Sequence, residues 1–324
     1  MTDTWTWATV TQATPLRIKV DGDTTQLDAT TDNLVGSLAV DDRVRVHLHS
    51  DGIIVTGIQG GGNRSNPNLL INSNFAVNQR AYVSATNLAL NAYGFDRWKA
   101  TTANSRMTFT AATQGQTVTI AAGDSFGQVV ERADVLAGPH TLSWEGTSQA
   151  RVYNVGGSPP SYAASPIAVT LDGNANVLVE FGSGTLVKVK LERGTVATPY
   201  TLPHIGNELA ACQRYCLTFI AGTAAQRLGG WGVQFGATGA ETLIITPVTM
   251  RTIPTITFLN LWWTDAVGFD SIVSAIDARY PTTPAASPNG LPVVVTFAAA
   301  GAARYPGTLA AQAAGSHLIL DADL

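Results

Sequence analysis

The residues whose types and spacing point most directly to chemistry are aromatic side chains beside a carboxylate. Residues 262–265 read Trp262-Trp263-Thr264-Asp265. Flat rings pack against the CH faces of sugars, and a nearby carboxylate bonds their hydroxyl groups, so this segment is a candidate carbohydrate-binding site. Successive residues of a strand face opposite sides, and at least one of the two tryptophans should therefore point outward.

Two tyrosines that precede prolines widen this candidate set. Tyr280 and Tyr305 lie in expected loops. The candidate carbohydrate-binding residues are Trp262, Trp263, Asp265, Tyr280 and Tyr305. The alternative is that one tryptophan of the pair fills a core and the other packs against a neighbouring subunit. Trp98 and Trp144 lie in patterned strands or at their edges, and we expect both in the core.

Cys212 and Cys216 are the 2 cysteines of the 324-residue chain. In a helix their spacing places both on one face, where a disulfide would need distorted geometry. A metal site would need more ligands, and none follows at motif spacing. We therefore expect two small buried apolar residues.

No catalytic motif is present. His47 and His49 share one strand face, but no third metal ligand is evident. Asp21-Gly22-Asp23 lacks the further oxygen ligands of a calcium loop and is expected to be a hairpin turn. The sequence contains no G-x-S-x-G elbow, HExxH helix or phosphate loop. A glycan-cleaving enzyme needs two carboxylates about 5–10 Å apart, and no spacing among the 23 acidic residues points to such a pair. We predict a protein that is not an enzyme and that has no catalytic residues, metal or cofactor.

Composition favours a β-rich chain. Charged residues make up only 13%, whereas about 25% is usual, and the 31 glycines and 15 prolines predict many turns. The net charge of −4, with 19 scattered basic residues, excludes a binder held on nucleic acid by bulk electrostatics. The start of the chain lacks the pattern of a signal peptide, and the apolar stretch 291–303 is too short to span a membrane. We expect no membrane insertion.

The first block of the chain, residues 1–59, predicts a small N-terminal β-barrel of the OB or SH3 kind. Segments such as Trp5–Val10, Leu16–Val20 and Val44–His49 alternate apolar and polar residues, which is the signal of a half-buried strand. Five short strands of this kind need closure to avoid exposed edges. Residues 60–67 follow as a glycine-rich linker and mark a domain boundary.

Two further blocks predict β-sandwiches. Residues 68–203 contain strand-like runs at even spacing, which is typical of a jelly roll. Residues 204–324 begin with a helix over residues 205–215 and continue with further strand-like runs, which predict a C-terminal β-sandwich. The predicted fold class is therefore mainly β throughout.

Several segments resemble bacteriophage tail fibres and receptor-binding proteins. The segments that carry this resemblance are 68–80 (NLLINSNFAVNQR), 93–98 (YGFDRW), 191–200 (LERGTVATPY), 208–216 with its "EL..CQRY" helix, 247–255 and the closing 321–324. The first block is similar to the N-terminal barrel of minor tail proteins from phages of actinobacteria, through Ala8-Thr9-Val10, Pro15-Leu16-Arg17, Leu34-Val35-Gly36 and Asp42-Arg43-Val44. Residues 265–315 match no family pattern.

The resemblance implies a virion tail component that touches the host surface. Its N-terminal domain, residues 1–59, would attach to other tail or baseplate proteins, and the C-terminal domains would bind host cell-wall glycan. Such proteins are commonly homotrimers with jelly rolls like those of carbohydrate-binding modules, so a second copy of the chain is an expected partner. Two alternatives remain open at this point, namely a passive structural subunit without receptor binding and a glycan depolymerase.

The resemblance also raises a structural calcium ion. Related sugar-binding jelly rolls often hold one near the strand that opens the domain, where Asn72, Asn74 and Asp96 could supply oxygens. Lys188-Val189-Lys190 stands where an acidic pair would help such an ion, and we therefore expect no calcium.

Overall fold

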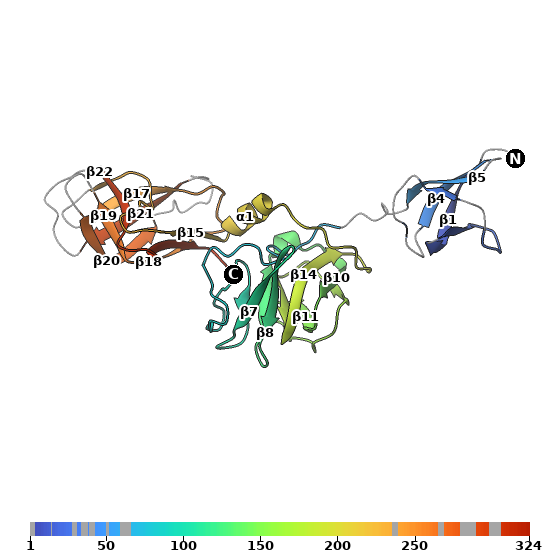
Figure 1. The fold of residues 1–324 in the computed structure, drawn as a ribbon, viewed down its shortest axis with the longest axis horizontal. Helices are drawn as coiled ribbons and strands as arrows, with labels where there is room; N and C mark the ends of the chain where they lie inside the picture. Colours follow the sequence, from blue (N-terminus) through green and yellow to red (C-terminus); the bar gives the residue numbers. More distant parts are fainter. Residues whose placement is uncertain are drawn as a thin grey trace. The chain divides into compact units, whose positions relative to one another are not determined.

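The computed structural model describes residues 4–13, 15–27, 31–33, 38, 43–49, 52–58, 66–234, 239–264, 269–278, 290–297 and 306–324. The fold is mainly β, as predicted, with one α-helix among these residues (Figure 1). Contacts divide the chain into two compact units. The first contains Met1–Pro67 with Val196–Thr201, and the second contains Asn68–Thr195 with Leu202–Leu324.

The first unit contains a five-stranded sheet in the order β2-β1-β4-β5-β3. Its strands are β1 (Thr4–Ala13), β2 (Leu16–Val20), β3 (Thr31–Asn33), β4 (Arg43–His49) and β5 (Gly52–Ile58). The predicted alternation is confirmed, because every second residue enters a small apolar core that includes Ala8, Val10, Val44 and Val46. β3 runs parallel to β5, and all other described pairs of this sheet are antiparallel.

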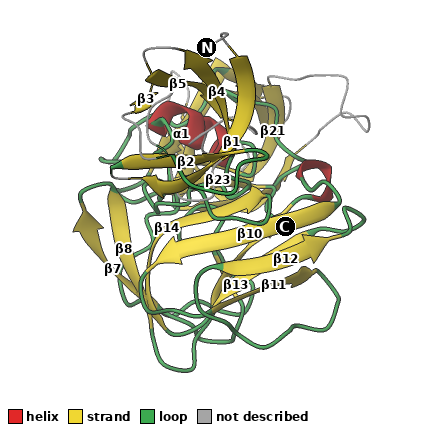
Figure 2. Ribbon diagram, turned by 90° about the vertical axis from the view of Figure 1, so that its right-hand side faces the viewer, coloured by secondary structure: helices red, strands yellow, loops and turns green. Residues whose placement is uncertain are grey.

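The second unit begins with a two-sheet sandwich, most of whose strands are labelled in Figure 2. One sheet has the order β12-β10-β14-β8-β7 and the other β11-β13-β9-β6. The strands are β6 (Lys99–Ala100), β7 (Met107–Ala112), β8 (Gly115–Ile120), β9 (Phe126–Val130), β10 (Gly138–Glu145), β11 (Ala150–Asn154), β12 (Ile167–Leu171), β13 (Val177–Phe181) and β14 (Gly184–Arg193). Trp98 and Trp144 lie in the apolar core of this sandwich, as predicted.

The last part of the second unit begins with helix α1 (Ile205–Gln213), which the spacing had predicted. The strands that follow are β15 (Cys216–Ile220), β16 (Gly232–Gln234), β17 (Gly239–Ile245), β18 (Thr255–Leu259), β19 (Leu261–Thr264), β20 (Phe269–Ala278), β21 (Gly290–Phe297), β22 (Pro306–Ala311) and β23 (His317–Asp321). Six of them close into a barrel in the order β16-β17-β21-β20-β19-β22, and the other three form the sheet β15-β23-β18. The strands that we expected in a sandwich are thus arranged as a barrel with an adjoining sheet.

Within the described part of the chain, no helix combines the length and the apolar character needed to cross a bilayer.

Candidate functional site

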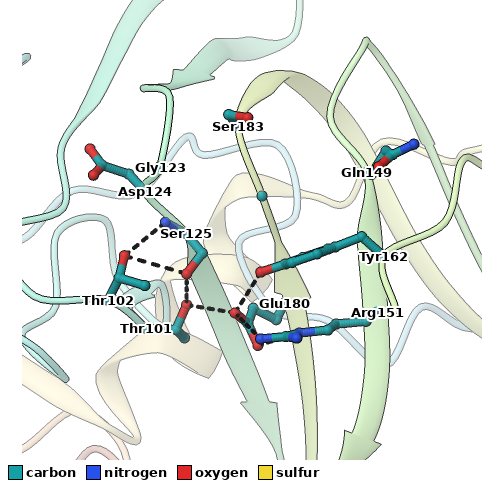
Figure 3. A pocket seen from close by; sticks show the side chains of 11 residues that line it. Thr101, Thr102, Gly123, Asp124, Ser125, Gln149, Arg151, Tyr162, Glu180 and Ser183 are labelled. Atoms are coloured by element: carbon teal, nitrogen blue, oxygen red, sulfur yellow. Dashed lines mark hydrogen bonds and ion pairs between the residues drawn. The ribbon is translucent and has the colours of Figure 1, made fainter. Parts of the chain in front are cut away.

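A polar pocket of about 390 Å³ lies on the outer side of the four-stranded sheet of the sandwich (Figure 3). It is lined by Thr101, Thr102, Gly123, Asp124, Ser125, Gln149, Arg151, Tyr162, Glu180, Gly182 and Ser183. Strand alternation explains its position. Val177, Val179 and Phe181 of β13 enter the core, so Glu180 between them faces outward.

Arg151 and Glu180 form the centre of the site because their strands are neighbours. Arg151 of β11 stands directly opposite Glu180 of β13 in the antiparallel register. On the other side, Glu180 stands opposite Gly127 of β9. A side chain at Gly127 would collide with the Val179 carbonyl at 2.7 Å and would crowd the Thr101 methyl at 3.3 Å. Glycine at this position therefore leaves room for Thr101 to reach the carboxylate.

Five hydrogen bonds converge on the Glu180 carboxylate. Arg151 donates from Nε and Nη2, each at 2.9 Å, in a bidentate pair. Tyr153 and Tyr162 each donate a phenol hydroxyl at 2.7 Å. The Thr101 hydroxyl adds a fifth bond at 3.2 Å, and Ser125 lies 2.6 Å from that hydroxyl. The carboxylate side chain is only 2% exposed, and these bonds satisfy both of its oxygens.

The titration behaviour follows from these contacts. Burial alone would raise the pKa of Glu180, but the hydrogen bonds from Arg151, Tyr153 and Tyr162 hold it below the usual glutamate value. Burial, together with hydrogen bonding to the Glu180 carboxylate, raises the pKa of Tyr153 and of Tyr162 to about 12. The cluster is therefore a fixed ionised pair with two neutral phenols across the physiological range.

The cluster offers binding groups rather than a proton donor. The Arg151 guanidinium lies 4.4 Å from the centre of the Tyr162 ring, which fixes the ring orientation. Glu180 accepts two of the five guanidinium N–H groups, and Arg151 also lines the pocket. A general acid for glycoside cleavage needs a raised carboxyl pKa, and Glu180 has a lowered one.

The predicted aromatic residues do not form one site among the described residues. Trp263 is fully buried in the core of the C-terminal barrel, so its inclusion as a sugar-contacting residue is wrong. Its ring points inward against Gly307, where a Cβ would lie 2.6 Å from the indole. Trp262, the preceding residue of β19, faces the other side and is partly exposed. Asp265, Tyr280 and Tyr305 lie outside the described residues.

The sequence contained only a partial signal for the pocket, because it does not show which strands pair. Residues 150–155 and 177–181 fall within the strand-like runs of the second block, and each contains a single charged residue, Arg151 or Glu180. An opposite-charge pair on neighbouring strands would have been the hypothesis to draw. Tyr162 lies in the loop between β11 and β12, and no local pattern marks it.

Several of the segments that carry the resemblance, 68–80, 93–98, 208–216 and 321–324, meet in a second place, a buried polar junction within the second unit. Arg97 and Arg80 donate to the Asp323 carboxylate at 2.5 and 2.8 Å, and Arg80 also reaches Asp321 at 2.8 Å. The Arg97 guanidinium stacks 3.5 Å over the Tyr215 ring. Arg97 and Asp323 are each 2% exposed, so this is a buried ion pair that joins the start of the sandwich to the last strand region.

Further bonds extend this junction to α1. Glu208 of α1 accepts a hydrogen bond from the backbone N–H of Asn72, and Trp98 donates its indole N–H to the Asn72 carbonyl at 2.9 Å. Cys212 and Cys216 are buried free thiols beside it, as predicted, and burial raises the pKa of both. The motifs that looked functional are therefore used here for packing.

The residues named for a calcium ion do not fit one. Gln79 donates to both carboxylate oxygens of Asp96, at 2.6 and 2.7 Å, and the Asn72 side chain is bonded to backbone groups of Val77 and Asp96. Only Asn74 Oδ1 is buried without a partner, and one oxygen does not make a calcium site. Among the described residues, no group of three His, Cys, Asp or Glu side chains could hold a metal. His47 instead stacks on Trp5, with ring centres 4.3 Å apart.

Comparison with known proteins gives little further guidance. No protein-family model and no curated protein matches the chain. Among solved structures, the chain is similar to the crystal structure of a Paenibacillus sp. cycloisomaltooligosaccharide glucanotransferase complexed with cycloisomaltoheptaose, with a TM-score of 0.20 and 9% sequence identity. The match covers 75% of this chain and 47% of that one, so the chain spans less than half the length of that protein. A likeness at this TM-score carries no argument about function.

Proposed function

We propose that this chain is a bacteriophage tail fibre or receptor-binding protein that adsorbs to a host cell-surface glycan through its jelly roll. The observation that supports glycan binding is the pocket around Arg151, Tyr162 and Glu180. It combines a flat aromatic side chain, a guanidinium held by two hydrogen bonds to the Glu180 carboxylate, and several hydroxyl and amide groups. Convergent groups of this kind recognise polyhydroxylated ligands.

Pre-organisation is the physical reason to place binding here. A ligand that enters the pocket meets Arg151 and Tyr162, whose side chains Glu180 already holds in place, so these two lose little conformational entropy on binding. The deduced site therefore lies in residues 68–203 rather than at the C-terminal aromatic residues that the sequence suggested.

Binding without cleavage is the activity that these contacts favour. Glu180 accepts five hydrogen bonds and has a lowered pKa, so it holds other groups in place and cannot donate a proton at neutral pH. We therefore retain the proposal of a non-enzymatic protein over a depolymerase. Release of reducing sugar from host wall material by the purified chain would overturn this part of the proposal.

The virion role rests on the resemblance of the sequence motifs to phage tail proteins. In this proposal residues 1–59 attach to other tail or baseplate proteins, the chain assembles as a homotrimer, and the protein resides in the virion tail. Light scattering on the purified full chain should give three times the mass of the chain. A monodisperse monomer would refute the trimer.

A pair of tyrosine variants tests the binding site. Tyr162 and Tyr153 donate equivalent 2.7 Å bonds to Glu180, but only Tyr162 lines the pocket. We expect Tyr162→Ala in the full chain to abolish binding on a glycan array and to host cells, and Tyr153→Ala, at a similar stability cost, to retain it. Equal loss in both variants, or binding unaffected by Tyr162→Ala, would show that the pocket is not the glycan site and would favour a passive structural subunit.

A further inference from the structure

The charge balance of the pocket restricts the ligand that it can accept. Its lining contains one cation, Arg151, and two carboxylates, those of Glu180 and Asp124. The guanidinium charge is already neutralised, because Glu180 binds it through two parallel bonds of 2.9 Å. Asp124 also lines the pocket, and its carboxylate accepts a bond from the backbone N–H of Arg106 but has no side-chain cation among its described hydrogen-bond and ion-pair partners. The pocket therefore presents a net negative charge.

An anionic sugar would be disfavoured by this arrangement. Recognition of a carboxylate, phosphate or sulfate uses an arginine or lysine whose charge is available to it. Arg151 could meet such a group only by giving up Glu180, which would then be left as a buried, unpaired carboxylate. An anion elsewhere in the pocket would still lie near Asp124, the other carboxylate of the lining, and like charges repel.

The remaining groups suit an uncharged sugar. In Figure 3, Gln149 and Ser183 lie on the side of the Tyr162 ring away from Arg151, so one face of the phenol is covered by the guanidinium and the other is turned toward them. Neither the Gln149 amide nor the Ser183 hydroxyl makes a side-chain hydrogen bond among the described residues, so both can bind ligand hydroxyls. The volume of about 390 Å³ is near the lower end for small-molecule sites, which suits a terminal sugar better than a long chain segment.

The geometry points to a terminal, uncharged sugar residue as the ligand of this pocket, with anionic sugars selected against by Asp124 and by the pre-formed Arg151–Glu180 pair. This inference rests on the proposed glycan-binding function and specifies its ligand class.

The test uses the full chain and matched sugars that differ only in charge. The probes are glucose with glucuronate, galactose with galacturonate, and mannose with mannuronate, and binding is measured by ligand-observed NMR and by titration. We expect at least one neutral sugar to bind about tenfold more tightly than its uronate. Tyr162→Ala should abolish the binding of that sugar. We expect Asp124→Asn to bring the two affinities of that pair closer together by severalfold.

The possible outcomes distinguish a wrong ligand class from a wrong binding site. A uronate that binds as tightly as its neutral partner, or more tightly, and that is still lost in Tyr162→Ala would overturn the ligand class and leave the glycan site in place. An unchanged affinity ratio in Asp124→Asn would also overturn the role given to Asp124. If no sugar of the panel binds in a Tyr162-dependent way, both the ligand class and the proposed glycan site are wrong.

Discussion

Replacing Glu180 by glutamine is the sharpest test of how the pocket is held together. The substitution keeps the shape of the side chain but removes its charge and one acceptor oxygen. Donors that now meet the amide nitrogen lose their acceptor, and the Arg151 guanidinium loses its counter-ion. Breaking a buried ion pair costs about 3–5 kcal/mol. Since Arg151 is 22% exposed and recovers some hydration, we expect the free energy of unfolding to fall by about 2–4 kcal/mol.

This loss should be visible in thermal unfolding of the full chain followed by calorimetry. For a unit of this size, about 2–4 °C is lost per kcal/mol, which predicts a Tm lower by roughly 4–16 °C. Glu145→Gln is the matched control, because Glu145 makes a similar 2.9 Å bond to Lys188 but the two side chains are 61% and 35% exposed. That control should change stability by at most about 1 kcal/mol. Equal melting curves for the two variants would refute the reasoning.

The same variant has a predicted pH dependence. The pKa of Glu180 is lowered in the folded protein, so its stabilisation is present above the unfolded-state value of about 4.5 and is lost as the pH falls through the lowered pKa. The difference in stability between the wild type and Glu180→Gln should therefore be constant from neutral pH to about pH 5 and shrink in acid. A difference that grows in acid would contradict the assigned direction of the pKa shift.

The remaining predictions concern the rest of the second unit. Asp323→Asn should lower the free energy of unfolding by about 3–5 kcal/mol in denaturant titrations. Asp321→Asn should lower it by about 1 kcal/mol or less, because the Asp321 carboxylate is 36% exposed. Equal losses in the two variants would contradict the buried junction. Trp263→Ala should lower the free energy of unfolding by about 3–5 kcal/mol in the same measurement. Trp262→Ala should lower it clearly less, because Trp262 is partly exposed. The reverse order would mean that the assigned strand faces are wrong. Both cysteine thiols should react with a thiol reagent only after unfolding, because they are buried and their pKa values are raised; rapid labelling of the native protein would refute their burial.

The fold class could be read from the sequence because alternation is a local property. Segments such as 44–48 show the period of two that a sheet with one buried face imposes, and they became β4 and its neighbours. Helix α1 was likewise predicted from spacing alone. The barrel in the third block was not predicted, since closure depends on which strands pair, and β22 pairs with both β16 and β19.

The site could not be read in the same way, because it depends on pairing between strands that are not consecutive. β11 lies beside β13 and not beside β12, and this pairing places Arg151 opposite Glu180. Alternation did predict that the two adjacent tryptophans face opposite sides. It could not say which one faces the core, because that choice depends on Gly307 in a distant strand.

The segments that carry the family resemblance lie mostly outside the pocket. Segments 68–80, 93–98, 208–216 and 321–324 carry the resemblance, and residues from each of them meet in the buried junction. In this structure they pack charged groups against one another away from water. The pocket lining from 149 to 183 falls in a part of the chain without such motifs.

The junction also bears on how the chain folds during synthesis. Arg97 lies in the segment that opens the sandwich, yet its carboxylate partner, Asp323, is translated more than two hundred residues later. At about 5–20 residues per second, the ribosome needs roughly 10–45 s to cover that interval. Until then the guanidinium has no counter-ion to accompany it into the interior, so the opening loop of a nascent chain should stay sensitive to protease after its strands have paired.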